Sequence, residues 1–201
     1  MYGSFGLWGV YLSFKMGFKG IINVEMKQPK SIIITVLVGV VMGVFFIVAD
    51  TISVNVRFGG LLMFRYSRIP SSIFASITEG IGCQILNMLT VVFIIWIFSA
   101  IVKTVEGRAK LFWVAAVLSA LIFSIRHIDS TMLWYSGSAR TIFHMPFEAY
   151  LAIIGLYAPL SLVCTYFFKK YGLLSAITIH FVSDVIWAYI QFGELILYPS
   201  N

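Results

Sequence analysis

The chain has 201 residues, of which 60% are hydrophobic and only 11% are charged. Soluble domains are typically about 45–50% apolar and about 25% charged, so this composition excludes an ordinary soluble domain. The apolar runs are continuous rather than alternating, which disfavours a β-barrel. We therefore expect an all-α, polytopic transmembrane bundle of about five to six spanning helices, forming a single membrane domain over residues 1–201.

The first expected elements lie before residue 71. Residues 1–20 are rich in glycine and aromatic residues, and they form either a short spanning helix or an interfacial one. Residues 31–49 carry no charge and predict a transmembrane helix. This helix contains Gly39 and Gly43, a spacing that lets two helix backbones approach closely, within one chain or between copies. Residues 50–70 are expected to be a connecting loop with an amphipathic piece.

The later elements continue the same alternation of apolar runs and basic connections. Residues 71–102 predict one long helix that can bend near its glycines, followed by a basic loop at 103–110. A polar loop is expected at 128–147 and a basic turn at 169–172. The remaining helices are predicted at 111–127, 147–168 (where Pro159 can introduce a kink) and 173–192.

The net charge of +6 does not indicate nucleic-acid binding, because the basic residues gather between the apolar runs. That pattern is typical of the cytoplasmic loops of a membrane protein, and it implies membrane lipid as a partner. If every apolar segment after residue 30 spans, the C-terminus lies outside. The basic residues then on the cytoplasmic side are Lys27, Lys30, Lys103, Arg108, Lys110, Lys169 and Lys170.

Two further sequence features concern processing and oxidation. No cleavable signal peptide is predicted, because Lys15 interrupts the first apolar run and no small-residue cleavage pattern follows it. Cys83 and Cys164 both fall in apolar segments, where they are expected as buried thiols rather than as a disulfide.

Four ionisable residues interrupt the apolar segments. Polar side chains at membrane depth cost roughly 2.5–3.5 kcal/mol each on insertion scales, so they mark candidate functional sites. His180 and Asp184 are four residues apart, which puts them on one helix face. Phe123 and His127 share that spacing, so the aromatic ring is expected to stack beneath the imidazole. Glu79 lies on a third helix.

Glutamate and histidine together suit the activation of a water molecule. A buried glutamate can act as a general base, and a histidine can orient the water, donate to an oxyanion or protonate a leaving amine. No serine or cysteine is flanked by these groups as a nucleophile would be. Direct attack by water is therefore favoured over a covalent intermediate.

The order of these motifs resembles the CPBP family, the CAAX-protease and bacteriocin-processing (Abi) membrane proteins. Phe123–His127 is similar to its Phe-x-x-x-His motif, and His180–Asp184 is similar to its His-x-x-x-Asn/Asp motif. The Glu-Glu-x-x-x-Arg motif of the family corresponds to Glu79, with Gly80 and Gln84 in place of the second Glu and the Arg. The resemblance covers residues 71–192.

This resemblance implies an intramembrane endopeptidase in the cell membrane of a bacterium, working without metal or cofactor on a membrane-associated peptide or peptide precursor. By resemblance, Glu79 and His127 activate the water. His180 and Asp184 stabilise the oxyanion, with Asp184 taking the place of a frequent Asn. An ionised Asp cannot donate a hydrogen bond, so Asp184 is expected to be protonated or to orient His180.

Other functions stay open. The altered first motif favours a non-catalytic family member that acts as an immunity protein, scaffold or regulatory subunit on a membrane-protein partner. Two histidines and a carboxylate can also bind zinc, although they come from three helices rather than from a His-Glu-x-x-His helix. A transporter or proton relay is a further alternative, which the absence of an evident inverted repeat disfavours.

Overall fold

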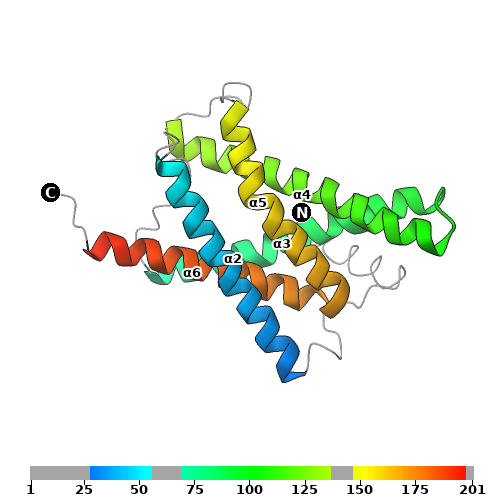
Figure 1. The fold of residues 1–201 in the computed structure, drawn as a ribbon, viewed down its shortest axis with the longest axis horizontal. Coiled ribbons are helices and arrows are strands. Elements are labelled where there is room, and N and C mark those ends of the chain that lie inside the picture. Colours follow the sequence, from blue (N-terminus) through cyan, green and yellow to red (C-terminus); the bar gives the residue numbers. More distant parts are fainter. Residues whose placement is uncertain (1–27, 56–68, 137–146, 198–201) are drawn as a thin grey trace.

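The computed structural model describes residues 28–55, 69–136 and 147–197, and these ranges contain no strand. This result confirms the all-α class. The helices are α2 (Pro29–Asn55), α3 (Ile69–Ser99), α4 (Val105–Ser136), α5 (Phe147–Tyr171) and α6 (Leu173–Leu197) (Figure 1). The expected segment 1–20 lies outside the described residues.

Several helices are longer than the apolar runs that predicted them. The expected basic loop 103–110 is wrong beyond Thr104, because the Thr104 hydroxyl accepts a hydrogen bond of 3.0 Å from the Gly107 N–H and caps α4. The expected loop 128–147 is wrong at its start, since α4 continues to Ser136. Likewise α2 continues to Asn55. An apolar run marks the part of a helix that suits lipid, whereas backbone hydrogen bonding continues beyond it.

Three of the helices in the described part of the chain are long and apolar enough to cross a membrane. Their candidate spans are Pro29–Ala49, Gly80–Ser99 and Ala109–His127, and α6 contributes a shorter apolar stretch, Leu173–Trp187. Each of the three is about the length that a hydrocarbon core of roughly 30 Å requires. A membrane location is therefore consistent with the helices of the fold.

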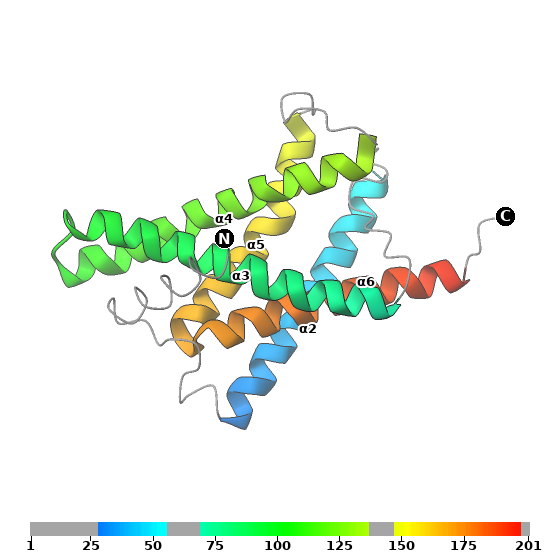
Figure 2. The ribbon, with the colours of Figure 1, turned by 180° about the vertical axis from the view of Figure 1, so that it is seen from behind.

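The helices cross one another rather than forming a parallel bundle. In Figures 1 and 2, α3 and α4 lie side by side and are joined by the short connection 100–104, while α2 and α5 run across them. Helix α6 packs against α2, α3 and α5, and α4 packs against α3 and α5. Every helix that carries a predicted site residue therefore contacts another such helix.

The small-residue motif of α2 packs against α6 of the same chain. A Cβ added at Gly39 would lie 2.7 Å from the Val182 Cβ, and one added at Gly43 would lie 2.7 Å from the Ile186 Cβ. Both distances are too short for real carbon atoms, so only glycine allows this approach. Of the two packing modes left open by the sequence, the one within the chain is observed.

The reversal between α5 and α6 needs only one non-helical residue. Gly172 has a positive φ of 97°, and its N–H donates to the Phe168 carbonyl at 2.9 Å. The Ser175 hydroxyl donates to the Phe167 carbonyl at 2.9 Å. The basic turn expected at 169–172 is thus largely helical, and the tight reversal keeps α6 against α5.

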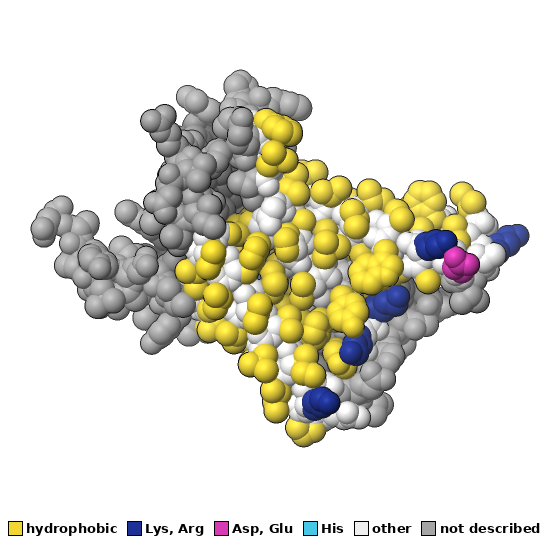
Figure 3. Space-filling view, in the orientation of Figure 1, with side chains coloured by type: hydrophobic (Ala, Val, Ile, Leu, Met, Phe, Trp, Pro, Cys, Tyr) yellow, Lys and Arg dark blue, Asp and Glu magenta, His cyan; other side chains and the backbone are white. Residues whose placement is uncertain are grey.

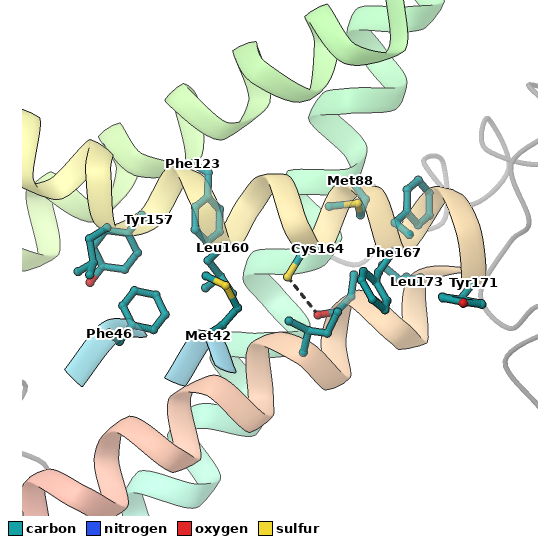
Figure 4. Packing of buried hydrophobic residues seen from close by; sticks show 14 of the residues in the cluster. Met42, Phe46, Met88, Phe123, Tyr157, Leu160, Cys164, Phe167, Tyr171 and Leu173 are labelled. Carbon is teal, nitrogen blue, oxygen red and sulfur yellow. Dashed lines mark hydrogen bonds between the residues drawn. The ribbon is translucent and has the colours of Figure 1, made fainter. Parts of the chain in front are cut away.

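The largest apolar cluster lies between α5 and its neighbours (Figure 4). The rings of Phe46 and Tyr157 lie 5.9 Å apart, and those of Phe46 and Trp187 lie 6.2 Å apart. The Cys164 thiol lies 3.5 Å from the Ala176 carbonyl oxygen. Both cysteines are free thiols, as expected, and Cys164 is buried as predicted, whereas Cys83 is only partly buried. In lipid such clusters hold helices together mainly by close van der Waals packing.

The outer surface is broadly apolar. Figure 3 shows a face covered by hydrophobic side chains, with its Lys and Arg side chains toward one edge at the lower right. The start of α2, the α3–α4 connection and the α5–α6 turn lie toward the same edge in Figure 1. The exposed lysines of these three places are Lys30, Lys103, Lys110, Lys169 and Lys170. This grouping agrees with the predicted topology.

Candidate active site

His180 is held by contacts at both ring nitrogens. Its side chain is buried in α6, and Nδ1 lies 2.7 Å from the Gln84 Nε2 of α3. Its Nε2 lies 3.4 Å from the Asp184 Oδ2, one turn further along α6. The predicted one-face arrangement of His180 and Asp184 is therefore confirmed. The contact with Gln84 was not predicted, because the two residues are 96 positions apart in the chain.

His127 is held by its own helix and by aromatic rings. Its Nδ1 lies 2.7 Å from the Phe123 carbonyl oxygen, so this nitrogen carries the proton and donates. Its ring centroid lies 4.5 Å from that of Phe123 and 4.0 Å from that of Tyr157, with an angle of 22° between the planes of the His127 and Tyr157 rings. The predicted contact of Phe123 with His127 is confirmed, and Tyr157 of α5 covers the ring as well.

The Phe123 ring joins the two histidines. It is 2% exposed, and its centroid lies 5.9 Å from that of His180 in an edge-on arrangement. The same ring contacts His127. Two imidazoles from α4 and α6, 53 positions apart in sequence, therefore meet on one buried aromatic side chain, in a part of the molecule with little access for bulk water.

Gly80 lies where α3 packs against α6. A Cβ added at Gly80 would lie 3.5 Å from the backbone nitrogen of Phe181, which is ordinary contact, so a small residue fits here. Because Gln84 lies one turn after Gly80, this close approach brings its amide within reach of His180. Gly80, which stands where the CPBP motif has a second Glu, thus has a packing role.

A second buried polar group ties α3 to α4 and α5. The Asn87 Nδ2 donates to the Ser161 hydroxyl at 2.8 Å. The Ser119 hydroxyl lies 2.6 Å from the Asn87 Oδ1 and 2.9 Å from the Asn87 carbonyl oxygen. Asn87 and Gln84 are three residues apart, so one face of α3 carries both buried amides. These contacts hold α3 and α4, which carry site residues, in a defined register.

Not every predicted site residue is described. Glu79 belongs to α3, immediately before Gly80, but its side chain lies outside what the structure describes. His127, His180 and Asp184 are described, and Phe123 and Gln84 link them. Among the described side chains, no group of three or more His, Cys, Asp or Glu is arranged to hold a metal ion. The Glu79 side chain is not among these described side chains.

Sequence reasoning missed three contributors to the site: Gln84, Tyr157 and Asn87. Gln84 was noted only for standing where the CPBP motif has an arginine. The available signal was a pair of amides three residues apart in an apolar helix, since a buried amide needs partners. Nothing in the sequence pointed to Tyr157, because an aromatic residue in a membrane helix is ordinary.

No family model, no curated protein and no solved structure matches this chain. The resemblance to the CPBP family therefore stays a prediction drawn from the spacing of the motifs. Independently of it, the geometry places an imidazole beside a second imidazole and a carboxylate. Such a group can move a proton and donate a hydrogen bond at the same place.

Proposed function

We propose that the chain is an intramembrane peptidase that hydrolyses a peptide bond of a membrane-associated substrate by direct attack of water. The observation that carries this proposal is the meeting of His127 and His180 on the buried Phe123 ring. Of two imidazoles in one buried site, one can act as the base and the other as the hydrogen-bond donor.

His127 and Glu79 activate the water in this mechanism. Because the Nδ1–H of His127 donates to the Phe123 carbonyl, the lone pair of the neutral ring lies on Nε2. That lone pair accepts a proton from the attacking water and later returns it to the leaving amine. Glu79, one residue before the span Gly80–Ser99, accepts the second hydrogen bond of the same water.

His180 stabilises the oxyanion formed on the peptide carbonyl. Its contact with the Asp184 carboxylate, at 3.4 Å, is longer than the roughly 2.7–2.9 Å of a strong charge-assisted bond. The Nε2–H can therefore be shared with a substrate oxygen. Asp184 orients the imidazole in this scheme, which is the role open to an ionised carboxylate.

The membrane setting narrows the substrate class. A chain with about five to six spans, in the cell membrane of a bacterium, presents such a site to peptides already held in or at the bilayer. Three long apolar helices and the basic edge support this setting. The proposed mechanism uses no metal and no cofactor.

The test is cleavage of a panel of membrane-associated peptides by the purified protein in lipid nanodiscs. Wild type and Glu106→Gln are expected to cleave, while Glu79→Gln does not. Glu106 is the matched control because it is an exposed glutamate paired with Lys110 at 2.7 Å, on the outside of α4. Equal cleavage by Glu79→Gln and wild type would remove the proposed role of Glu79, and loss of cleavage on chelation would favour zinc.

A second candidate function is a non-catalytic membrane partner, such as an immunity protein, scaffold or regulatory subunit. The contact of Gln84 with His180 favours it, because the residue in place of the motif arginine uses one nitrogen of an imidazole proposed for catalysis. This alternative predicts that Glu79→Gln and His127→Asn keep biological function while a membrane protein co-purifies with each.

A further inference from the structure

Gln84 is a fully buried polar side chain that contacts a site histidine. Its exposed fraction is 0%, and its Nε2 lies 2.7 Å from the His180 Nδ1. Its Oε1 has no hydrogen-bond partner among the described residues. The orientation of this amide is therefore governed by its contact with His180.

The Gln84 amide and the Asp184 carboxylate together determine which nitrogen of His180 carries the proton. An amide NH₂ group can only donate, so the Nδ1 that faces it must accept and cannot be protonated. The proton of the neutral ring is then on Nε2, which faces the Asp184 carboxylate. The opposite amide orientation would put the Nε2 lone pair toward that carboxylate, where an ionised oxygen repels it.

In His127 the proton lies on the other ring nitrogen, Nδ1. A backbone carbonyl can only accept, so the His127 Nδ1 that faces the Phe123 carbonyl is protonated. Both rings contact Phe123, yet their Nε2 atoms differ: that of His127 carries a lone pair and that of His180 carries a proton.

We infer that Gln84 is a positioning residue that, together with Asp184, holds His180 in the Nε2–H tautomer, opposite to the Nδ1–H tautomer of His127. The pair then offers one acceptor and one donor while both imidazoles are neutral, before the water is deprotonated. Gln84 supplies no group to a substrate and acts only through His180. The use of this pair in catalysis rests on the proposed function, whereas the tautomers themselves do not.

The test is nitrogen NMR of the full chain in nanodiscs, labelled with ¹⁵N only in histidine. The chain has three histidines, and the third, His144, lies outside the described residues. The variant His144→Gln therefore leaves two ring systems, and His180→Asn assigns them. Couplings from the ring nitrogens to the carbon-bound ring protons identify which nitrogen is protonated. The expected result is Nε2–H for His180 and Nδ1–H for His127.

Two single variants separate the contributions of Asp184 and Gln84. In Asp184→Asn, His180 is expected to show a mixture of both tautomers, because the Gln84 amide can then turn either its NH₂ group or its Oε1 toward Nδ1. In Gln84→Leu, Asp184 is expected to keep the proton on Nε2, while the ¹⁵N signal of the unprotonated Nδ1 shifts because its donor is lost. Asn87→Ser removes the other buried amide of α3 and is expected to leave both the tautomer and the Nδ1 signal of His180 unchanged.

The thermal unfolding midpoint of each variant in nanodiscs reports its folding, because the His127 hydrogen bond lies within one helix and survives loss of packing between helices. A proton on Nδ1 of His180 in the wild type would overturn the inference. So would an Nδ1 signal of His180 that is the same in Gln84→Leu as in the wild type. None of these readouts needs cleavage, so failure of the inference is distinguishable from failure of the proposed function.

Discussion

Helix α6 meets α2 on one side and α3 on another, and the two contacts are built differently. Against α2, the packing depends on Gly39 and Gly43, whose missing side chains make room for Val182 and Ile186. Against α3, a Cβ added at Gly80 would meet only ordinary contacts, and a hydrogen bond from Gln84 to His180 is added.

The two contacts control different properties: one sets the position of a helix and the other sets the orientation of a side chain. Close van der Waals packing sets how near two helices lie, but it does not determine which way an imidazole turns or where its proton sits. A hydrogen bond determines both. We therefore expect changes on the α2 side to affect mainly folding stability, and changes on the α3 side to affect mainly activity.

The largest expected effect is on the α3 side. His180→Asn removes the proposed oxyanion donor and is expected to lower kcat by about 100- to 1000-fold, as loss of such a donor does in other enzymes. The measurement is steady-state cleavage in nanodiscs. Thr178→Val is the control, because that hydroxyl bonds only within α6, to the Leu174 carbonyl at 2.8 Å. A similar loss in both variants would contradict a specific role for His180.

On the α2 side, Gly43→Leu is expected to destabilise the fold by about 1–3 kcal/mol, since the added side chain overlaps Ile186. The free energy of unfolding in mild detergent measures it. Gly82→Leu is the matched control, because no atom lies within 4 Å of a Cβ added there. Equal destabilisation by both would show that helix geometry, rather than the contact with α6, matters.

A smaller effect is expected for Gln84→Leu. A single hydrogen bond is worth about 0.5–1.5 kcal/mol, so its loss corresponds to a fall in kcat of about two- to tenfold as His180 loses its fixed orientation. KM is expected to stay the same, because Gln84 does not contact the substrate in this proposal. A rise in KM at constant kcat would instead indicate a binding role.

The smallest effect is expected away from both sides of α6. Glu106→Gln breaks an exposed pair with Lys110 and is expected to cost about 0.3–0.5 kcal/mol of stability, less at high salt. Chemical unfolding at low and high salt measures it. This small loss of stability is the reference for the effects of substitutions on α6. A larger loss would indicate that the start of α4 contributes more to folding stability than an exposed ion pair does.

Local features of the site could be predicted from sequence. The contacts of Phe123 with His127 and of His180 with Asp184 follow from a spacing of four residues on a helix, whatever the rest of the molecule does. The contact of Gln84 with His180 could not be predicted in this way. It depends on how two helices cross and on their register, and both helices are apolar around most of their circumference.

The sequence by itself determined the helical class, the apolar stretches that suit a membrane and the pairing of residues one turn apart. Composition and helix periodicity are properties of single segments, so they can be read without knowing the partners of those segments. Only the tertiary structure decided that Gly39 and Gly43 contact α6, that Tyr157 covers His127 and that Gln84 reaches His180. Those contacts depend on side-chain packing between helices, which an almost uniformly apolar sequence encodes only weakly.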